Sequence, residues 1–336
     1  MAETIEVRAY REGDEYGIVA GYNEVFPTPD GKIPRRDIDH WRWLFRDNPV
    51  GSIQITVADH ETEGIVGAYP VVPLRMTIDG ERRIGAQVVD LYVVPRHRRY
   101  GKRPGLFVSL GLEHYRLWTG IGKTEIHFGW AVPAWRIGHK YLSYENIRDW
   151  NFLFRRADVP GFGRRSEPGD LEVVEVSRYG EDVDRLWARL EPTFRCATVR
   201  DSIYLNWRYA DARSFRYRLL ECRNRRDGAL RGIAVFSTCD FLFDHTSFLV
   251  DWLVPADDGD ATLSLIAAAE KMAQEARSPV LATLFNPIDP RSLIFQDHGF
   301  RVFGTTYFIC MAPFDHRGTV FYRDHWYLTC GDSDLV

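Results

Sequence analysis

The order of apolar and polar residues divides the first half of the chain into short strands and helices. Alternation at residues 5–9 predicts a strand, and apolar residues at helical spacing predict a helix at 16–25. Runs of β-branched and aromatic residues bounded by turn residues predict further strands at 53–58, 65–70, 74–78, 83–94 and 124–130. Short helices are expected at 41–48, 106–118 and 133–142. The pattern is typical of a mixed α/β (α+β) domain.

The stretch from Val88 to Phe107 carries the clearest functional signal. Val88–Val94 is apolar and β-branched, as expected for a strand buried on both faces, and Pro95 ends it. A loop of Arg, His, Lys and Gly follows, and Pro104 stands at a suitable first position for the next helix. The amides of such a loop and the helix N-terminus point to one place, with basic side chains around it. The sequence therefore predicts an anion-binding element, for which a basic solvated turn is the alternative.

Landmarks of the first half recur in the second half in the same order. A connector rich in Arg, Pro, Gly and Asp covers residues 155–170 and separates the two halves. Trp41-Arg42-Trp43 lies 36 residues after Ile5, and Trp207-Arg208-Tyr209 lies 36 residues after Leu171. The other matched segments are 89–95 with 250–255 and 133–144 with 286–300. We therefore interpret the chain as two repeated units.

The second copy differs at the position of the basic loop. Residues 256–260 read Ala-Asp-Asp-Gly-Asp, which is acidic and has no arginine. An acidic loop repels an anionic ligand. We therefore expect one anion-binding site, in the first half.

Composition narrows the class of protein. The 336 residues suit two domains, and 45% hydrophobic residues suffice for sizeable cores. A net charge of −4 argues against a general nucleic-acid binder. The five scattered cysteines have no metal-type spacing, so we expect reduced thiols and no metal site. Without a signal-like start or an apolar run of about 18 residues, a cytoplasmic protein with no membrane span is expected.

The loop resembles the acyl-CoA pyrophosphate loop of the GNAT superfamily of N-acyltransferases, whose pattern is Gln/Arg-x-x-Gly-x-Gly/Ala. Arg98 and Gly101 match this pattern, whereas Arg103 stands where Gly or Ala is usual. Pro104 also removes one amide. The resemblance implies two tandem GNAT-like domains, each a mixed, mostly antiparallel twisted sheet with a splayed central parallel strand pair and flanking helices. The expected parts are a GNAT domain at 1–154, a linker at 155–170, a degenerate GNAT-like domain at 171–313 and a tail at 314–336.

The resemblance also implies a donor site in the first domain. Acetyl-CoA or another acyl-CoA is the expected co-substrate, with pantetheine pairing along one splayed strand and the diphosphate held by the loop. The amine would attack the thioester directly, and no cysteine lies in the two splayed strands. The residues expected to bind the donor are Leu91, Tyr92, Val93, Val94, Arg98, Arg99, Tyr100, Gly101, Lys102, Arg103 and Gly105.

Three residues are candidates for proton transfer. Asp90 is a carboxylate in an apolar run, which suits a base or an anchor for an ammonium; a structural pairing with a loop or an arginine is the alternative. By resemblance, His139 takes the position of the usual acid, three residues before Leu142, and a surface histidine is its alternative. Tyr144, like Tyr141, is a nearby substitute.

Four residues are candidates for acceptor binding. Trp130 ends the second splayed strand and could stack on a ring, and His127 on the same strand could accept a proton; core packing explains both as well. The aromatic and acidic tail is expected to fold over the acceptor cleft and offer Asp332 or Asp334 to an ammonium, with a disordered tail as the alternative.

These observations favour an acyl-CoA-dependent N-acyltransferase that acts on a primary amine of a small molecule. Resemblance to enzymes that acylate nucleotide-linked amino sugars suggests such a sugar as acceptor. The alternatives are a Fem-type aminoacyl-tRNA-dependent transferase, N-acylation of a peptide or metabolite, and a non-catalytic CoA-binding pseudoenzyme. A monomer and a homodimer are both compatible with the sequence.

Overall fold

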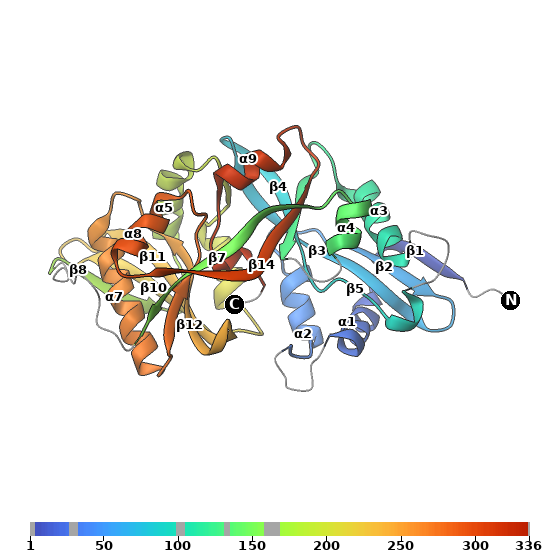
Figure 1. The fold of residues 1–336 in the computed structure, drawn as a ribbon, viewed down its shortest axis with the longest axis horizontal. Helices are drawn as coiled ribbons and strands as arrows, with labels where there is room; N and C mark the ends of the chain where they lie inside the picture. The colour runs from blue at the N-terminus through green and yellow to red at the C-terminus, as the bar shows by residue number, and fades with distance from the viewer. Residues whose placement is uncertain (1–3, 27–32, 99–104, 131–134, 158–168, 335–336) are drawn as a thin grey trace. The chain divides into compact units, whose positions relative to one another are not determined.

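The computed structural model describes residues 4–26, 33–98, 105–130, 135–157 and 169–334, which form two compact units (Figure 1). The first unit comprises Met1–Met76, Arg82–Arg148 and Phe308–Arg323. The second unit comprises Thr77–Glu81, Asp149–Tyr307 and Asp324–Val336. Each half of the chain thus gives a short segment to the other unit, an exchange that the sequence pattern did not indicate.

The sheet of the first unit has the strand order β1-β2-β3-β4-β6-β14. Strands β4 and β6 run parallel, whereas β2 is antiparallel to β1 and β3, and β14 is antiparallel to β6. The elements are β1 (Ile5–Ala9), α1 (Asp14–Val25), α2 (Ile38–Trp41), η1 (Arg42–Arg46), β2 (Gln54–His60), β3 (Gly64–Ile78), β4 (Glu81–Val88), β5 (Tyr92–Val93), η2 (Pro95–His97), α3 (Leu106–Trp118), β6 (Thr124–Trp130), α4 (Trp135–Tyr141), the start of β7 (Glu145–Arg156), the end of β14 (Arg301–Pro313) and the start of α9 (Gly318–His325).

The sheet of the second unit has the order β14-β7-β13-β12-β11-β10-β8, and its parallel pair is β12 with β13. The elements are β8 (Leu171–Val176), α5 (Glu181–Leu190), η3 (Glu191–Thr193), β9 (Cys196–Thr198), α6 (Ser202–Leu205), η4 (Asn206–Ala210), β10 (Tyr217–Asn224), β11 (Leu230–Phe241), β12 (Phe243–Leu253), α7 (Gly259–Glu275), β13 (Val280–Thr283), α8 (Pro290–Asp297), β15 (Trp326–Tyr327) and η5 (Cys330–Asp332). The mixed α/β class with a large mixed sheet and flanking helices is confirmed.

Helix α3 packs directly on the sheet of the first unit. The hydroxyl of Thr56 on β2 donates to the carbonyl of Leu110, 3.0 Å away and fully buried. Glycines allow the close approach: a Cβ at Gly67 would lie 3.2 Å from Leu110, and a Cβ at Gly111 would lie 2.6 Å from Leu142. This packing fixes the position of the start of α3 relative to the strands before it.

The strand expected at 83–94 is broken by a one-residue bulge. Val89 N–H donates to Pro70 O, and the next pair along the ladder is Tyr92 with Ala68. Between these two contacts the chain advances three residues after β4, from 89 to 92, and two residues along β3, from 70 to 68. The extra residue defines a β-bulge. Asp90 has the left-handed φ of 48° inside it. The single strand predicted at 83–94 was therefore wrong, as was the division of β3 into 65–70 and 74–78.

The second unit has a bulge at the matching place. β11 advances one residue, from Val235 to Phe236, while β12 passes from Asp251 to Leu249. The two units also share a capped helical turn that continues as a π-helix, with Asp37 and Asp201 as the caps. These caps align Trp43, rather than Trp41, with Trp207, so the sequence match at this motif was two residues off. That the two units are a tandem repeat stays a prediction that these shared features support.

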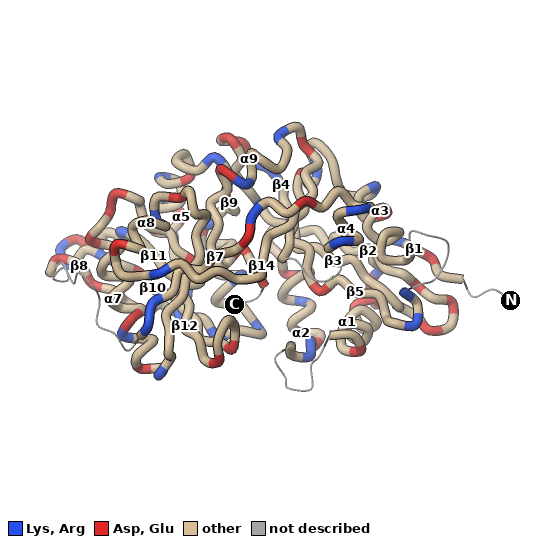
Figure 2. Tube along the Cα trace, viewed as in Figure 1, with Lys and Arg blue, Asp and Glu red and all other residues tan. Residues whose placement is uncertain are grey.

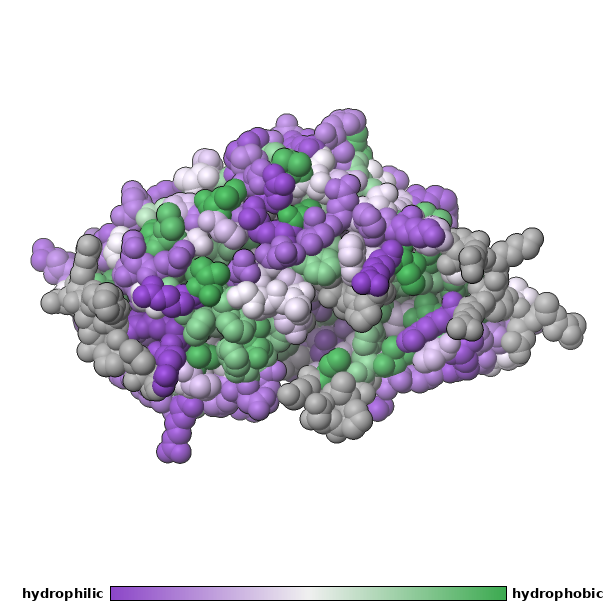
Figure 3. All heavy atoms as spheres, viewed as in Figure 1, coloured by the Kyte–Doolittle hydropathy of each residue, from purple (hydrophilic) through white to green (hydrophobic). Residues whose placement is uncertain are grey.

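Basic and acidic residues both occur along both units (Figure 2), and their totals of 43 and 47 nearly cancel. Apolar side chains on the face seen in Figure 3 are interspersed with polar ones. Among the described residues, no helix is both long and apolar enough to cross a membrane.

Candidate active site

The parallel strands of the first unit separate at their C-terminal ends. β4 and β6 pair as far as Gln87 and Phe128. Beyond that point β5 pairs with β3, while Gly129 and Trp130 of β6 pair with β14. The strands therefore diverge at the bulge, and this agrees with the expected splayed pair.

The backbone of Val93 faces the diverging side. Val94 N–H donates to Val66 O at 2.9 Å, so Val94 directs its amide toward β3. Because antiparallel strands alternate the direction of their amides, the amide and carbonyl of Val93 point away from β3. Val93 is therefore a described residue of the predicted donor strand whose amide is directed away from β3, toward the side where an added chain would pair. Tyr92 instead packs its ring under α1, where a Cβ at Gly21 would lie 2.3 Å from its hydroxyl oxygen.

Two predicted donor residues flank the basic loop. Arg98 Nε donates to Val93 O at 3.1 Å, which ties the start of the loop to the strand. At the other end, Gly105 has a φ of 95°, and a Cβ there would lie 3.5 Å from Arg98 O. The two ends of the loop therefore converge. Arg99, Tyr100, Gly101, Lys102 and Arg103 lie outside the described residues, so their predicted roles stay predictions.

The N-terminus of α3 starts at this point. Gly105 is its N-cap and supplies no side-chain cap, and the first turn carries no acidic residue. The first N–H groups of a helix lack intrahelical partners and carry partial positive charge. The N-terminus of α3 is therefore suited to hold an anionic group, as the sequence predicted.

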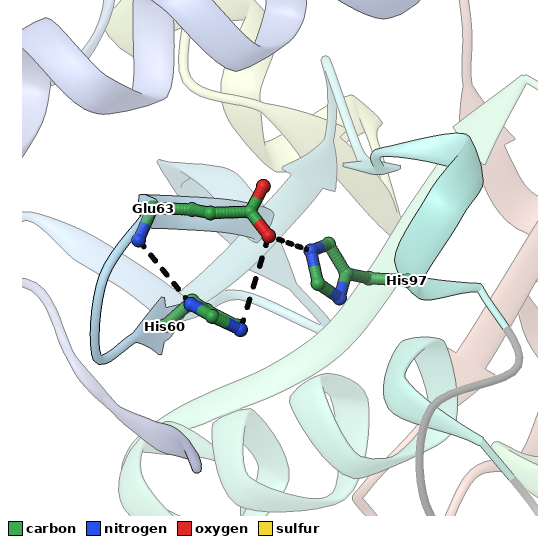
Figure 4. A group of neighbouring side chains, drawn as sticks. All are labelled: His60, Glu63 and His97. Carbon is green, nitrogen blue, oxygen red and sulfur yellow. Dashed lines mark hydrogen bonds and ion pairs between the residues drawn. The ribbon is translucent and has the colours of Figure 1, made fainter. Parts of the chain in front are cut away.

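A carboxylate next to this loop contacts three basic side chains. Figure 4 shows Glu63, in the β2–β3 turn, between His60 and His97. Their potential metal-ligand atoms lie within 4.8 Å of one another. However, His60 Nδ1 accepts from the amides of Thr62 and Glu63 at 3.2 Å, whereas a neutral imidazole bound to a metal through Nε2 carries its proton on Nδ1. Arg96 also already pairs with Glu63 at 2.6 Å. The geometry favours an ion-pair network over a metal site.

Asp90 lies in the bulge rather than in a strand. Its carboxylate is 3.4 Å from the guanidinium of Arg36, and both side chains are mostly buried. The Arg36 guanidinium also lies 5.2 Å from the centroid of the Tyr22 ring. The pairing with arginine matches the structural interpretation of Asp90, and its catalytic role stays a prediction.

His139 is exposed on α4 and has a fixed tautomer. Nδ1 lies 2.6 Å from Tyr144 O, and a carbonyl only accepts, so Nδ1 carries the proton. In the neutral ring, Nε2 is therefore the basic nitrogen. The ring also contacts Trp135 at a centroid distance of 5.4 Å. This arrangement suits a residue that exchanges a proton through Nε2.

Tyr144 and His127 lie in the core of the first unit. The hydroxyl of Tyr144 hydrogen-bonds to that of Tyr69, and burial raises the pKa of both phenols. His127 is fully buried, with ring centroids of His114 and Phe314 at 5.0 and 5.1 Å. Burial lowers the pKa of His127 to about 3. The surroundings of His127 match the core-packing alternative, and those of the largely buried Trp130 do as well. The role predicted for the buried Tyr144 stays a prediction.

One cysteine reaches the splayed strands through the fold. Cys310 on β14 pairs with Gly129, and its Sγ donates to Gly129 O at 3.4 Å. The sequence missed this proximity because Cys310 is 181 residues away. Burial raises the pKa of the thiol to about 12, so it is protonated at neutral pH and is a poor nucleophile.

Part of the tail lies at the ends of β12 and β13, the parallel strand pair of the second unit. β12 and β13 pair at Ser247–Leu281 and Phe248–Ala282. Tyr327 OH donates to Trp252 O beyond the end of this pairing on one side, and Asn286 donates to Trp326 O at 3.1 Å on the other. Residues 326 and 327 of the tail therefore contact the chain beyond the ends of both β12 and β13.

A buried ion-pair network fastens this tail. Arg200 donates to Asp251 Oδ1 at 2.8 Å and to Asp332 Oδ2 at 2.7 Å, and all three side chains are at most 2% exposed. Thr198 donates to the other oxygen of Asp332 at 2.7 Å. The carboxylate of Asp332 is thus occupied within the second unit, which favours a structural role over the predicted contact with an ammonium. Asp334 is partly buried, and its predicted role stays a prediction.

Sequence reasoning missed the partners of the candidate site. The sequence did not single out three of them: Glu63, which binds Arg96; Arg36, which binds Asp90; and Arg200, which binds Asp251. In each pair the two residues lie at least 33 positions apart in the chain. An unpaired Asp90 inside an apolar run did signal that some partner must exist.

Comparison with known proteins places the fold. No protein-family model and no curated protein matches the sequence. A GCN5-related N-acetyltransferase from Anabaena variabilis superposes with a TM-score of 0.64 at 10% identity, covering 93% of this chain and 73% of that one. One from Kribbella flavida gives 0.61 at 14%, covering 93% and 71%. Saccharomyces cerevisiae N-myristoyltransferase with bound myristoyl-CoA gives 0.58 at 14%, covering 93% and 82%. The chain therefore has the fold of GNAT-type N-acyltransferases.

Proposed function

We propose that the protein is an acyl-CoA-dependent N-acyltransferase with one donor site, in the first unit. The observation that carries the proposal is the divergence of β4 and β6 at a bulge, followed by Arg98, Gly105 and the uncapped start of α3. An extended amide chain and a diphosphate are the two ligand parts that such a strand and such a helix N-terminus accommodate. The neighbour with bound myristoyl-CoA supports the choice of donor.

The residues present fit an acyl-CoA. The main chain of Val93 would pair with the pantetheine amides, and the first amides of α3 together with Arg98 would hold the diphosphate. A bound acyl-CoA supplies a thioester as the electrophile. Attack by the amine nitrogen forms the new C–N bond and breaks the C–S bond. The amine then loses a proton, and the thiolate gains one.

His139 is the described candidate for the proton transfers. Its Nδ1 is fixed by the Tyr144 carbonyl, so Nε2 can accept a proton from the amine or, once protonated, return it to the thiolate. Asp90, held by Arg36, would orient the incoming ammonium. Cys310 takes no part, because its thiol is protonated at neutral pH.

We propose a small-molecule primary amine as acceptor, with a nucleotide-linked amino sugar as the narrower candidate. The narrower candidate rests on sequence resemblance alone. N-acylation of a peptide is the second candidate, and the N-myristoyltransferase neighbour favours it. A tRNA-dependent transferase would not need an anion site for CoA, so the start of α3 counts against it.

A transfer assay tests the proposal. The protein is incubated with acetyl-CoA or myristoyl-CoA and with amino sugars, nucleotide-linked amino sugars or peptides with a free N-terminus, and thiol release is measured. We expect release that depends on the acceptor, and a thermal shift with CoA alone, about 2.7 kcal/mol of stabilisation at a hundredfold excess over Kd. Binding without release for any acceptor would favour a pseudoenzyme, and absence of binding would refute the donor site.

A further inference from the structure

The basic residues next to the donor loop differ in what they contact. Arg96 is paired twice: its guanidinium lies 2.6 Å from Glu63 Oε2 and 2.5 Å from Glu24 Oε1 on α1. Arg98, two residues later, uses its Nε on the carbonyl of Val93. The charge of Arg96 is therefore neutralised by carboxylates, whereas Arg98 is directed along the donor strand.

Glu63 also holds the residue between these two arginines. His97 Nε2 lies 2.9 Å from Glu63 Oε1, and because a carboxylate only accepts, Nε2 donates. The His97 side chain is only 8% exposed, so the ring cannot turn to water without breaking the packing of η2. The hydrogen bond from Arg96 is the main reason that the pKa of Glu63 is lowered, so the carboxylate stays charged at neutral pH.

The position of Glu63 is itself fixed. Its amide and that of Thr62 donate to His60 Nδ1, at 3.2 Å each, and the His60 side chain is fully buried. The turn is thus anchored to the core of the first unit, and the carboxylate projects from it toward η2 (Figure 4). Each oxygen of Glu63 holds one of the two residues that immediately precede Arg98.

We propose that Glu63 is a positioning residue for the diphosphate part of the donor site. It fixes Arg96 and His97, and through them the point at which the chain leaves η2 and Arg98 meets Val93. The inference rests on the proposed function, because it assumes that Arg98 and the start of α3 hold a diphosphate. Glu63 itself does not touch the donor; as an anion it would repel it.

The test compares two donors that differ in the diphosphate. Acetyl-CoA contains it, and S-acetylpantetheine lacks it. Glu63→Gln keeps the shape of the side chain and removes its charge. Glu61→Gln is the matched control, since it removes the same charge from the same turn and Glu61 is exposed. KM and kcat are measured for both donors with each variant, and the Kd of CoA is measured by calorimetry.

We expect Glu63→Gln to raise the KM for acetyl-CoA and the Kd of CoA by about five- to tenfold, the lower end of coupling between linked sites. The kcat and the KM for S-acetylpantetheine should stay within about twofold of the wild type, and Glu61→Gln should behave as wild type. Equal losses with both donors, or no loss relative to Glu61→Gln, would overturn the proposal.

A second variant covers a failure of Glu63→Gln to fold. His97→Asn removes the other half of the contact with Glu63 and should give the same donor-specific loss. If neither variant distinguishes the donors, Glu63 has no positioning role. If the wild-type protein does not bind CoA at all, it is the proposed function that fails.

Discussion

Replacing His127 with leucine should make the stability of the protein less sensitive to mild acid. His127 is fully buried on β6, and among the described residues neither ring nitrogen has a hydrogen-bond partner. Its neighbours within about 5 Å are the rings of His114, Tyr115 and Phe314. Burial in these surroundings disfavours the charged imidazolium.

The magnitude follows from the pKa. Burial lowers the pKa of His127 from 6.5 in the unfolded chain to about 3 in the folded one. Between these values the unfolded state binds one proton more than the folded state, so the free energy of unfolding falls as the pH falls. Above pH 6.5, where His127 is neutral in both states, the free energy of unfolding carries no penalty from this residue. The loss of this free energy reaches about 2 kcal/mol between pH 7 and pH 5, and about 4 kcal/mol near pH 3.

Urea denaturation of the wild type and of His127→Leu at pH 7, 6 and 5 and constant ionic strength measures this difference. Any change of packing caused by leucine shifts the curve of the variant by the same amount at every pH. His114 is present in both proteins; burial and, second, the charge of His127 lower its pKa, so the variant also loses the repulsion between the two rings. We expect the wild type to lose about 2 kcal/mol more than the variant from pH 7 to pH 5. Parallel pH dependences would show that water or a partner reaches the ring, and would refute the reasoning.

Three further predictions concern the two units. Arg98→Met should raise the KM for acetyl-CoA about tenfold or more and that for S-acetylpantetheine much less, because only acetyl-CoA loses a charge-assisted contact with its diphosphate, while both donors lose the bond from Arg98 to Val93 O; an unchanged KM for acetyl-CoA would contradict the donor site. His139→Gln should lower kcat about a hundredfold with little change in KM and remove one limb of the pH–rate profile; a pH profile like that of the wild type would contradict its role. Arg200→Met should cost about 3–5 kcal/mol in urea unfolding and expose the tail to proteolysis, because it leaves two buried carboxylates unpaired; a loss below about 1 kcal/mol would contradict the importance of the network.

Local signals predicted the central element of the first unit well. The apolar run ending at Pro95 and the Pro-Gly pair at 104–105 fixed the expected helix at 106–118, and α3 spans the same residues. The strand at 124–130 also matches β6. Both elements are defined by residues that are adjacent in sequence, which is why a pattern along the chain suffices for them.

Features that depend on distant residues were missed. The bulge at Asp90 needs the register of β3, and the roles of Arg36 and Glu63 need the fold that brings them to the loop. The aromatic tail signalled order, but its place across β12 and β13 depends on Arg200, which is 132 residues from Asp332. Patterns of hydrophobicity carry no information on such pairings.

The structure of the protein bound to coenzyme A tests the central claim most directly. We predict one molecule per chain, with the pantetheine along Val93 and the diphosphate at the first amides of α3 beside Arg98. Coenzyme A in the second unit, next to the acidic residues 256–260, or at neither place in a protein that still transfers acyl groups, would contradict the account.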